Sequence, residues 1–258
     1  MTDYGLVSII TPSYNSAPFI AETIESVLAQ TYAHWELLIT DDCSTDSTCA
    51  IVERYAEKDN RIKLLRLSTN SGAGAARNNS IERAQGRYIA FCDSDDCWYP
   101  DKLEKQLAFM TDKDCALSYT SYMTCNEAGE HTGIVVCRRR ETLFSMQCDD
   151  GMGCLTVIYD THKVGRVLMP LLRKRQDWGL WLQVLMQCRV AYGVKEPLAV
   201  YRLRENSISR KKASLIKYNL AVYRKVLGWS SAKAHLFFWF VFAPTYTLKK
   251  LGRMYINR

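Results

Sequence analysis

The sequence predicts an α/β fold in which helices flank a mostly parallel sheet. Over the first 110 residues, short β-branched runs typical of buried strands alternate with stretches of helical period. This alternation is typical of a parallel sheet with right-handed crossovers. Polar clusters follow three of the predicted strands, and open sheets of this kind bind ligands at the carboxyl ends of their strands.

The first part of the chain contains four strand–helix units. The strands are predicted at residues 6–11, 35–40, 62–67 and 88–92. The helices are predicted at residues 19–28, 46–57, 72–84 and 101–110. Asn15 and Ser16 are candidate caps of the first helix, and Pro100 suits the start of the fourth.

The pattern becomes less regular from residue 115 onward. Antiparallel strands are expected at residues 117–124 and 132–137, a loop at 138–140, a helix at 177–188 and a short strand at 198–201. We therefore expect one domain with two halves and an appended tail. They span residues 1–112, 113–205 and 206–258.

Charge is distributed unevenly over the 258 residues. The chain has a net charge of +7, but residues 1–110 sum to −6 and residues 111–258 to +13. Residues 201–258 carry 13 basic residues and one acid, Glu205. A nucleic-acid enzyme would be basic around its groove, whereas here the part with the candidate site is acidic. We expect no nucleic-acid partner, and a basic aromatic tail fits an anionic membrane surface.

The tail contains a basic helical stretch at residues 209–227 and an apolar run at residues 234–248. The apolar run has 15 residues, whereas a transmembrane helix needs about 20. We interpret it as an amphipathic helix that lies in the membrane interface, with aromatic rings toward the lipid and lysines toward the head groups. The alternative is a helix that packs on the protein's own core.

Ten cysteines occur without any CxxC pair, and the four histidines are scattered. This pattern argues against a structural zinc site and indicates reduced thiols in a cytosolic protein. The residues before the first strand do not have the pattern of a signal peptide.

The cluster Asp93-Ser94-Asp95-Asp96 directly follows the fourth strand. Three carboxylates within four residues repel one another unless a cation lies among them. Hard oxygen ligands favour Mg²⁺ or Mn²⁺, which could also bridge a diphosphate. The alternative interpretation is a solvated acidic turn.

Together with this cluster, three further segments make the chain resemble the inverting family 2 glycosyltransferases of GT-A fold, of the bacterial surface-polysaccharide type. The four segments are residues 7–15, 36–46, 70–78 and 88–101, in the order and spacing of that family. The resemblance is strong over residues 6–112, weaker over 113–205 and loose in the tail. It implies a nucleotide-sugar donor half at 1–112, and an acceptor and catalytic-base half at 113–205.

The resemblance assigns a nucleotide base pocket to the ends of the first two strands. Thr11, Pro12 and Tyr14 would form its floor and stacking wall, although Tyr14 could simply pack in the core. Asp42 would accept a hydrogen bond from the base imide, which favours uracil or thymine, while Asp41 would brace the loop. The alternative for this aspartate pair is a solvated turn that caps the following helix.

The same resemblance places the donor diphosphate near the acidic cluster. Arg77 would approach the nucleotide or Asp93, unless it is an ordinary surface arginine. Asp93 and Ser94 would contact the nucleotide, and Asp93 and Asp95 would hold the metal ion. Asp96 could share these tasks or only shape the turn.

A second site is predicted at Gln176-Asp177-Trp178, where a helix begins. The family carries a carboxylate in this context as general base, and Asp177 would remove the acceptor hydroxyl proton. Many relatives have Glu where this chain has Gln176, so the assignment rests on Asp177 and on the following aromatic residues, with Trp178 and Trp181 as further candidates. The alternative for Asp177 is an N-cap.

A last family-like segment includes Arg202, Arg204 and residues 207–212. In relatives a similar segment closes over the donor diphosphate, and either arginine could bind it. The alternative is a basic loop beside the membrane.

Three functions remain open at this stage. The first is sugar transfer with inversion, from a UDP-sugar to a lipid-linked saccharide, with Mn²⁺ or Mg²⁺ as cofactor. It would contribute to surface polysaccharide synthesis, peripherally, at the cytoplasmic face of the inner membrane. The second is nucleotidyl transfer to a sugar phosphate, although no basic glycine-rich loop follows the first strand. The third is a non-catalytic membrane-bound scaffold. A dinucleotide oxidoreductase is excluded because no GxGxxG follows the first strand.

Overall fold

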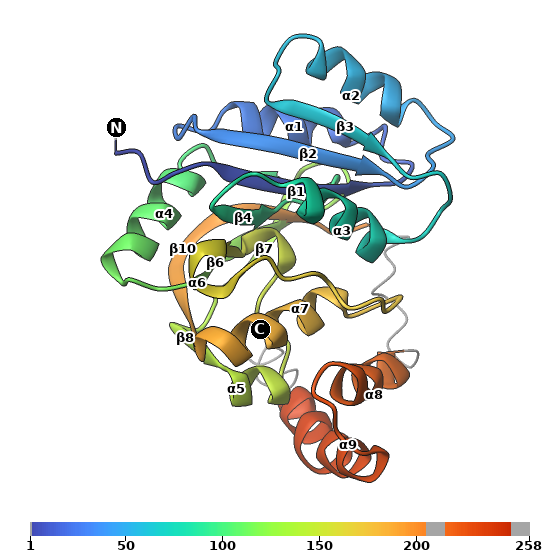
Figure 1. The fold of residues 1–258 in the computed structure, drawn as a ribbon, viewed down its shortest axis with the longest axis vertical. Coiled ribbons are helices and arrows are strands. Elements are labelled where there is room, and N and C mark those ends of the chain that lie inside the picture. The colour runs from blue at the N-terminus through green and yellow to red at the C-terminus, as the bar shows by residue number, and fades with distance from the viewer. Residues whose placement is uncertain (1, 205–214, 249–258) are drawn as a thin grey trace.

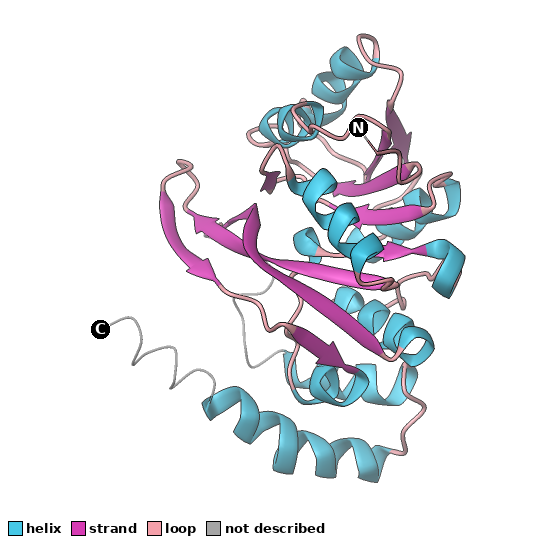
Figure 2. Cartoon of the chain, turned by 90° about the vertical axis from the view of Figure 1, so that its left-hand side faces the viewer, coloured by secondary structure: helices cyan, strands magenta, loops and turns pink. Residues whose placement is uncertain are grey.

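A ten-stranded sheet forms the centre of the computed structural model, which describes residues 2–204 and 215–248 (Figure 1). The main strand order is β3-β2-β1-β4-β9-β6-β10-β5, with β7 paired to β6 and β8 paired to β10. Strands from both predicted halves share this one sheet, and helices cover both of its faces (Figure 2).

The first half confirms the predicted strand–helix units. Its strands are β1 (Val7–Ser13), β2 (Trp35–Asp41), β3 (Ile62–Arg66) and β4 (Tyr88–Phe91), and all of them pair in parallel. Its helices are α1 (Ile20–Leu28), α2 (Thr48–Ala56), α3 (Ala73–Arg83) and α4 (Lys102–Asp112). Because β1 pairs with both β2 and β4, the loops that follow these three strands meet at one edge of the sheet.

The predicted caps of the first helix are wrong. Helix α1 begins only at Ile20, and no side chain caps it. The backbone carbonyl of Ser16 accepts the N–H groups of Phe19 and Ile20 instead. Asn15 turns the chain with a positive φ of 47° and accepts the Thr45 N–H through its side-chain oxygen, so it joins two loops rather than capping a helix.

The second half is more elaborate than the sequence pattern indicated. Its strands are β6 (Leu117–Cys125), β7 (His131–Val135), β8 (Arg140–Thr142), β9 (Ile158–Asp160) and β10 (Val190–Arg202). The short β5 (Cys97–Trp98) comes from the first half and pairs antiparallel with β10. Its helical segments are α5 (Leu143–Cys148), η1 (Cys154–Thr156), α6 (Thr161–Val164) and α7 (Gln176–Cys188). The expected loop at 138–140 ends at Arg140, where β8 begins.

Strand β10 corrects the short strand predicted at residues 198–201. It is 13 residues long and runs parallel to β6, with register shifts on both sides of Pro197. Proline cannot donate to the strand ladder, and Lys195 and Glu196 interrupt the apolar alternation just before it. For this reason the sequence pattern indicates only the part of β10 that follows Pro197, and not the part that precedes Lys195.

Each face of the sheet carries its own hydrophobic core. Val7 and Ile9 of β1 pack with helices α1, α2 and α4, while Ile10 packs in the core that includes α3 and α7. Successive side chains of a strand point to opposite faces, so one strand contributes to both cores. Because both faces of the sheet are packed against a core, the carboxyl edge of the sheet keeps a fixed shape.

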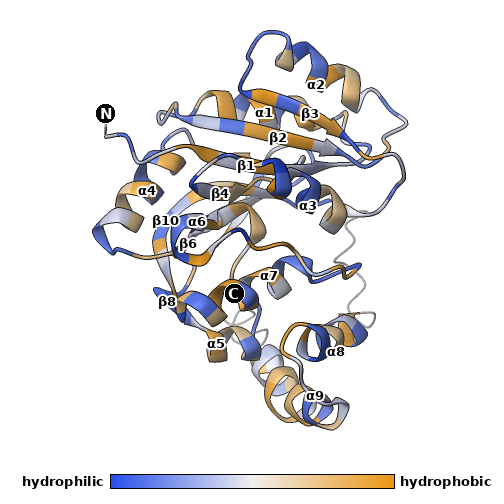
Figure 3. Ribbon diagram, in the orientation of Figure 1, coloured by the Kyte–Doolittle hydropathy of each residue, from blue (hydrophilic) through white to orange (hydrophobic). Residues whose placement is uncertain are grey.

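The structure supports the alternative given above for the tail, a helix that packs on the protein's own core, and the membrane interpretation stays a prediction. Helices α8 (Leu215–Lys225) and α9 (Ser231–Phe237), together with the π turn Phe238–Phe242, bury Tyr223, Phe238 and Phe242 in the core that contains α7. Leu236, Trp239 and Phe240, in α9 and the π turn, are more than half exposed. Figure 3 colours the ribbon of this segment as largely hydrophobic. Over the described residues, no helix is both long and apolar enough to span a bilayer.

Substitutions on the buried side and on the exposed side of the tail should change the stability of the protein by different amounts. Phe242→Ala should lower the free energy of unfolding by about 3–5 kcal/mol, because it empties a site where Phe242 is 4% exposed against Trp178. Phe240→Ala, on a side chain that is 75% exposed, should change it by less than about 0.5 kcal/mol. Guanidinium unfolding of both variants measures this, and equal losses would show that the tail does not pack as described.

Candidate active site

The carboxyl edge of the parallel strands brings together three polar loops, as predicted. Ser13 at the end of β1 is paired in register with Asp41 of β2, and its hydroxyl lies 3.2 Å from an Asp41 carboxylate oxygen. The Ser16 and Ser94 hydroxyls lie 2.7 Å apart, which connects the loop after β1 to the loop after β4. The edge is thus tied together by side chains and not by strand pairing alone.

The predicted base pocket has both a buried floor and an exposed wall. Thr11 and Pro12 are buried in β1, and the Thr11 hydroxyl has no hydrogen-bond partner among the described residues. Tyr14 is 50% exposed, so the structure does not support the alternative that it packs in the core. An exposed ring beside a buried hydroxyl without a partner suits a planar ligand that also offers a polar group.

Asp41 and Asp42 are both buried, and neither is a solvated turn residue. Asp41 accepts the Ser44 N–H at 2.8 Å, the bracing role expected of it. The two carboxylate oxygens of Asp42 accept the N–H groups of Ser71 and Gly72 at 2.6 and 2.7 Å. Gly72 has a φ of 88°, a conformation that favours glycine, where the chain turns into α3. Each Asp42 oxygen keeps a further lone pair for a ligand.

Arg77 lies buried between the two predicted parts of the site. Its guanidinium is paired with Asp93 at 2.5 Å, and its side chain is 8% exposed. Burial disfavours the cation, but the attraction of Asp93, with contributions from Cys154 and Asp177, raises the pKa of Arg77 above its usual value. Its Nε has no hydrogen-bond partner among the described residues. The alternative of an ordinary surface arginine is therefore wrong.

The carboxylates of the acidic cluster differ in their surroundings. Burial and the neighbouring Asp93 raise the pKa of Asp95, while Arg204 lies 3.2 Å from one of its oxygens and opposes that shift. Asp96 is 2% exposed, and burial followed by repulsion from Asp95 and Asp93 raises its pKa well above 3.8. Asp96 accepts the backbone N–H of Arg202 at 2.9 Å, so it fixes the end of β10 to the cluster and shapes the turn.

The two arginines of the predicted closing segment have different environments. Arg202 is 4% exposed and is held by Glu22 at 2.5 Å and by the Asp95 carbonyl at 3.0 Å. These contacts occupy it within the fold, which corrects its assignment as a diphosphate ligand. Arg204 is about one-third exposed and faces the Asp95 carboxylate, so it can still reach a ligand there. Residues 207–212 lie outside the described residues.

Asp177 is the second residue of α7 and lies within the electrostatic reach of Arg77. The N-cap position belongs to Arg175, which has a positive φ of 67°, whereas the Asp177 carboxylate accepts the N–H of Trp178 at 2.9 Å within the first turn. The starts of α3 and α7 are in close contact, because a Cβ on Gly74 would lie 3.0 Å from Cγ of Gln176. The structure therefore brings the predicted base to the donor edge.

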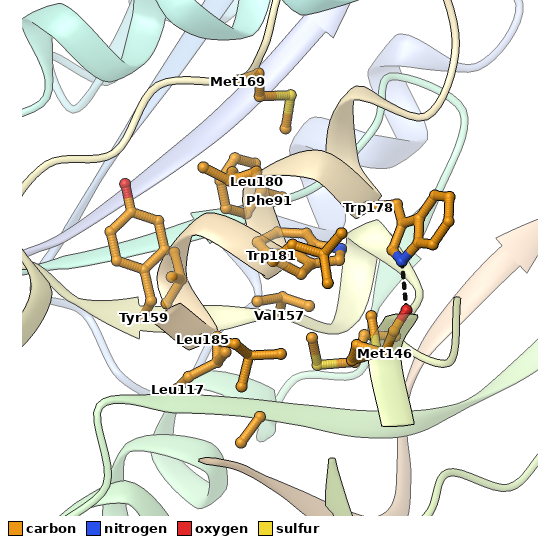
Figure 4. Close-up of a cluster of buried hydrophobic side chains, with 14 of the residues drawn as sticks. Phe91, Leu117, Met146, Val157, Tyr159, Met169, Trp178, Leu180, Trp181 and Leu185 are labelled. Carbon is orange, nitrogen blue, oxygen red and sulfur yellow. Dashed lines mark hydrogen bonds between the residues drawn. The ribbon is translucent and has the colours of Figure 1, made fainter. Parts of the chain in front are cut away.

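Trp178 and Trp181 do not line the site, which corrects their inclusion as candidates. Both are fully buried, and Trp178 donates its indole N–H to the Met146 carbonyl at 2.7 Å (Figure 4). Trp181 packs edge-on against Phe91 of β4. Their role is to hold α7 in the core so that Asp177 projects from a fixed helix.

Sequence reasoning missed Cys154 and Asn78. Cys154 begins η1, is close enough to Arg77, Asp93 and Asp177 to interact electrostatically, and has a pKa raised well above 9 by burial. The side chain of Asn78 pairs with the backbone of Met169, accepting at 2.7 Å and donating at 2.9 Å. Asn78 follows Arg77 in the quoted segment, which was its only signal, and nothing in the sequence indicated Cys154. All ten cysteines are free, as predicted.

The fit of a divalent cation depends on Asp93 and Asp95. Their side chains are 27% and 23% exposed, and burial together with the proximity of Asp93 raises the pKa of Asp95. Within the described residues, no three His, Cys, Asp or Glu side chains are arranged to hold a metal ion. Mg²⁺ commonly takes one or two carboxylates and completes its shell with substrate phosphates and water. The donor set fits a cation that is held jointly with a diphosphate.

Comparison with known proteins gives one family. The model of glycosyl transferase family 2 matches residues 8–156, more than half of the chain. Bacillus subtilis TuaG, named as a teichuronic acid biosynthesis glycosyltransferase, is 46% identical over 86% of this chain and 88% of its own length. Escherichia coli WfgD is 40% identical over 84% of each chain. Its name is UDP-Glc:alpha-D-GlcNAc-diphosphoundecaprenol beta-1,3-glucosyltransferase.

Solved structures support the same fold. Staphylococcus aureus TarS 1-349 in complex with UDP-GlcNAc superposes with a TM-score of 0.70 at 22% identity, over 88% of this chain and 69% of that chain. The mannosyltransferase PcManGT from Pyrobaculum calidifontis, in complex with GDP-Man and Mn²⁺, has a TM-score of 0.61 at 18% identity, over 100% and 82%. These likenesses confirm the predicted GT-A fold.

Proposed function

The chain belongs to glycosyltransferase family 2, and we propose that it transfers a sugar from a UDP-sugar to a hydroxyl of a lipid-linked saccharide, with inversion. The observation that carries the proposal is the buried Arg77, which pairs with Asp93 at the donor edge and also feels the charge of Asp177 on α7. Arg77 is thus paired with the carboxylate proposed for the donor and lies within electrostatic reach of the carboxylate proposed for the acceptor.

The donor half provides the nucleotide site. Thr11, Pro12 and Tyr14 form the base pocket, and Asp42 accepts the imide N–H with a lone pair that the Ser71 and Gly72 N–H groups leave over. Asp93 and Ser94 lie at the neighbouring strand end and contact the ribose and diphosphate. The unpartnered Nε of Arg77 adds a donor for an anionic group.

Asp93 and Asp95 would hold Mn²⁺ or Mg²⁺ together with the diphosphate. When bound, such an ion neutralises the charge that develops on the departing nucleoside diphosphate. Arg204 lies against Asp95 and can support the same negative charge.

The acceptor half provides the base. Asp177 takes the proton from the acceptor hydroxyl while that oxygen attacks the anomeric carbon, and the bond to the diphosphate breaks with its electron pair leaving on the diphosphate oxygen. No covalent intermediate is needed, so attack from the face opposite the leaving group inverts the anomeric carbon. The name of WfgD supports this, since a β-1,3 linkage made from the α-linked sugar of UDP-glucose requires inversion.

The tail would hold the enzyme at the cytoplasmic face of the inner membrane, as a peripheral protein. Leu236, Trp239 and Phe240 are between 55% and 75% exposed on one side of the tail. Lys233 lies beside an open apolar depression that Leu236 and Phe240 also line. Apolar rings with nearby cations suit an anionic lipid surface. A lipid-linked acceptor, as in the name of WfgD, would be met there during surface polysaccharide synthesis.

The activity can be tested directly. Incubation with single UDP-sugars, Mn²⁺ and a polyprenyl-diphosphate-linked N-acetylglucosamine should yield free UDP and an extended lipid product, detected by mass spectrometry. Release of pyrophosphate from a nucleoside triphosphate would instead support nucleotidyl transfer. No turnover with any donor would support the scaffold interpretation.

Asp177→Asn should retain UDP binding and lower the transfer rate by about 10²–10⁴, because the amide keeps the shape of the side chain but cannot accept the proton. UDP titration and single-turnover transfer measure the two effects. Asp112→Asn, at the exposed end of α4, is the matched control and should leave both unchanged. Full transfer by the Asp177 variant would contradict its role as base.

Removal of the metal ion with EDTA should lower turnover at least about a hundredfold, because several kcal/mol of leaving-group stabilisation is lost. Asp95→Asn should raise the Mn²⁺ concentration that gives half-maximal UDP binding, and Asp112→Asn should not. Turnover that persists in EDTA, with UDP binding indifferent to Mn²⁺, would rule out the metal-dependent mechanism.

The membrane face is tested by the double variant Trp239→Ser/Phe240→Ser, which should reduce flotation with phosphatidylglycerol vesicles severalfold. Ile134→Ser/Val136→Ser is the matched control, because those side chains are 52% and 58% exposed at the far edge, on and just after β7. Equal flotation of both variants and the unmodified protein would exclude docking through the tail. Complete deletion of the tail is less informative, since it also removes Phe238 and Phe242 from the core.

A further inference from the structure

The segment that leads into α7, residues 165–175, has an unusual composition. It carries four Lys or Arg residues and no acid, and most of its other residues are apolar. It has no helix or strand of its own, and it ends two residues before Asp177. We call it the acceptor loop. The chain therefore carries a basic and apolar segment directly before the proposed base.

The acceptor loop is anchored firmly to the body of the protein. Met169 is 2% exposed and makes the reciprocal hydrogen bonds with Asn78 of α3. Arg166 donates to the Ala84 carbonyl at 2.6 Å. Leu172 is 9% exposed and packs against the core that contains α7. The positions of the remaining side chains of the loop are therefore set by its anchors.

Between these anchors the loop presents apolar side chains to solvent. Leu168 is 39% exposed and Leu171 is 78% exposed, each directly beside a buried neighbour. Leu171 contributes little to the fold at this exposure, and burying its side chain against an apolar ligand would strengthen binding. An anchored loop with an outward leucine is a preformed contact for an apolar chain.

Three basic residues follow the exposed Leu171, after the buried Leu172. Arg175 is already paired with Asp150 at 2.6 Å and is mostly buried. Arg173 is exposed, and Lys174, partly exposed, follows it. Both precede the first turn of α7, whose N-terminal N–H groups also favour an anion. The order along the chain is therefore an apolar contact, then two cations, then Asp177.

The acceptor loop also lies on the side of α7 that carries the tail. A Cβ on Gly179 of α7 would lie 2.5 Å from Cγ of Pro170 in the loop and 3.3 Å from Cγ2 of Val226, just after α8. Figure 1 shows the loop and α8 at the same side of the molecule. The loop and the segment just after α8 therefore approach α7 at the same residue, two positions after Asp177.

We propose that the acceptor loop is the subsite for the polyprenyl diphosphate of the acceptor: Arg173 and Lys174 bind the diphosphate, and Leu171 contacts the first units of the lipid chain. This inference rests on the proposed function, in which the acceptor sugar is joined to a lipid diphosphate. Such a diphosphate lies about one sugar ring from the attacked hydroxyl, and the two cations lie three or four residues from Asp177. Charge-assisted hydrogen bonds to a diphosphate are among the stronger polar contacts available.

The test uses farnesyl diphosphate as the probe, titrated into full-length enzyme in neutral detergent with saturating UDP and Mn²⁺ so that the donor site is filled. The unmodified protein should bind the probe, and Arg173→Gln/Lys174→Gln should weaken binding at least about tenfold, the factor expected for one lost charge-assisted hydrogen bond. Leu171→Ser should weaken farnesyl diphosphate severalfold and leave inorganic pyrophosphate unaffected. Arg189→Gln, at the opposite end of the same helix, is the matched control and should change neither.

Each further outcome has one meaning. Equal binding by the unmodified protein and the double variant, or no binding by either, overturns the subsite. If phosphatidylglycerol vesicles without diphosphate lose affinity for the double variant as strongly as farnesyl diphosphate does, the loop is a general anionic-lipid contact and the proposal is wrong. The proposed function is judged separately by UDP release, so its failure cannot be mistaken for failure of the subsite.

Discussion

The buried ion pair between Arg77 and Asp93 is the contact on which the rest of the site depends. A guanidinium buried to this extent is unfavourable unless carboxylates compensate it, and here Asp93 does so at 2.5 Å with Asp177 as a second negative neighbour. Because Arg77 is on α3 and Asp93 follows β4, this ion pair joins these two elements, and Asp177 on α7 lies within electrostatic reach of it. The adjacent Asn78 extends this by pinning the loop that leads into α7.

The aspartates at the sheet edge divide into two groups according to what they touch. Asp41, Asp42 and Asp96 are buried and accept backbone N–H groups, so they hold loops in shape. Asp93 and Asp95 are partly exposed and are balanced by arginines. The first group builds a rigid frame, and the second offers charge to a ligand. Asn15, Cys43 and Arg175 adopt left-handed backbone conformations in the loops of this frame, a strain often held at functional sites.

Sequence reasoning recovers what is local and periodic. The strand–helix units of the first half and the meeting of polar clusters at one edge followed from alternation alone, whereas the metal-binding role of Asp93 and Asp95 stays a prediction. What failed depends on partners distant in the chain. The sequence shows Asp96 as one more carboxylate, but its partner is the backbone of Arg202. Trp178 looked like part of the site because it adjoins Asp177, whereas helical geometry turns it toward Met146. Cys154 lies near Arg77 because it begins the short helix η1, and the hydrophobic pattern of the sequence did not predict that helix.

Helix α7 connects the candidate site with the tail, because it carries Asp177 and also packs on the tail through Trp178. Its inner side carries Trp178, which packs against Phe242 of the tail, so the tail cannot shift without disturbing the helix that bears Asp177. The outer side of the tail exposes Phe240, and the acceptor loop exposes Leu171. In the proposed function a diphosphate head group lies at the lipid surface. Docking through the tail would then set the height of Asp177 above that surface, because the tail packs on α7 through Trp178 and on α5 through the hydrogen bond from the Tyr223 hydroxyl to the Gln147 carbonyl.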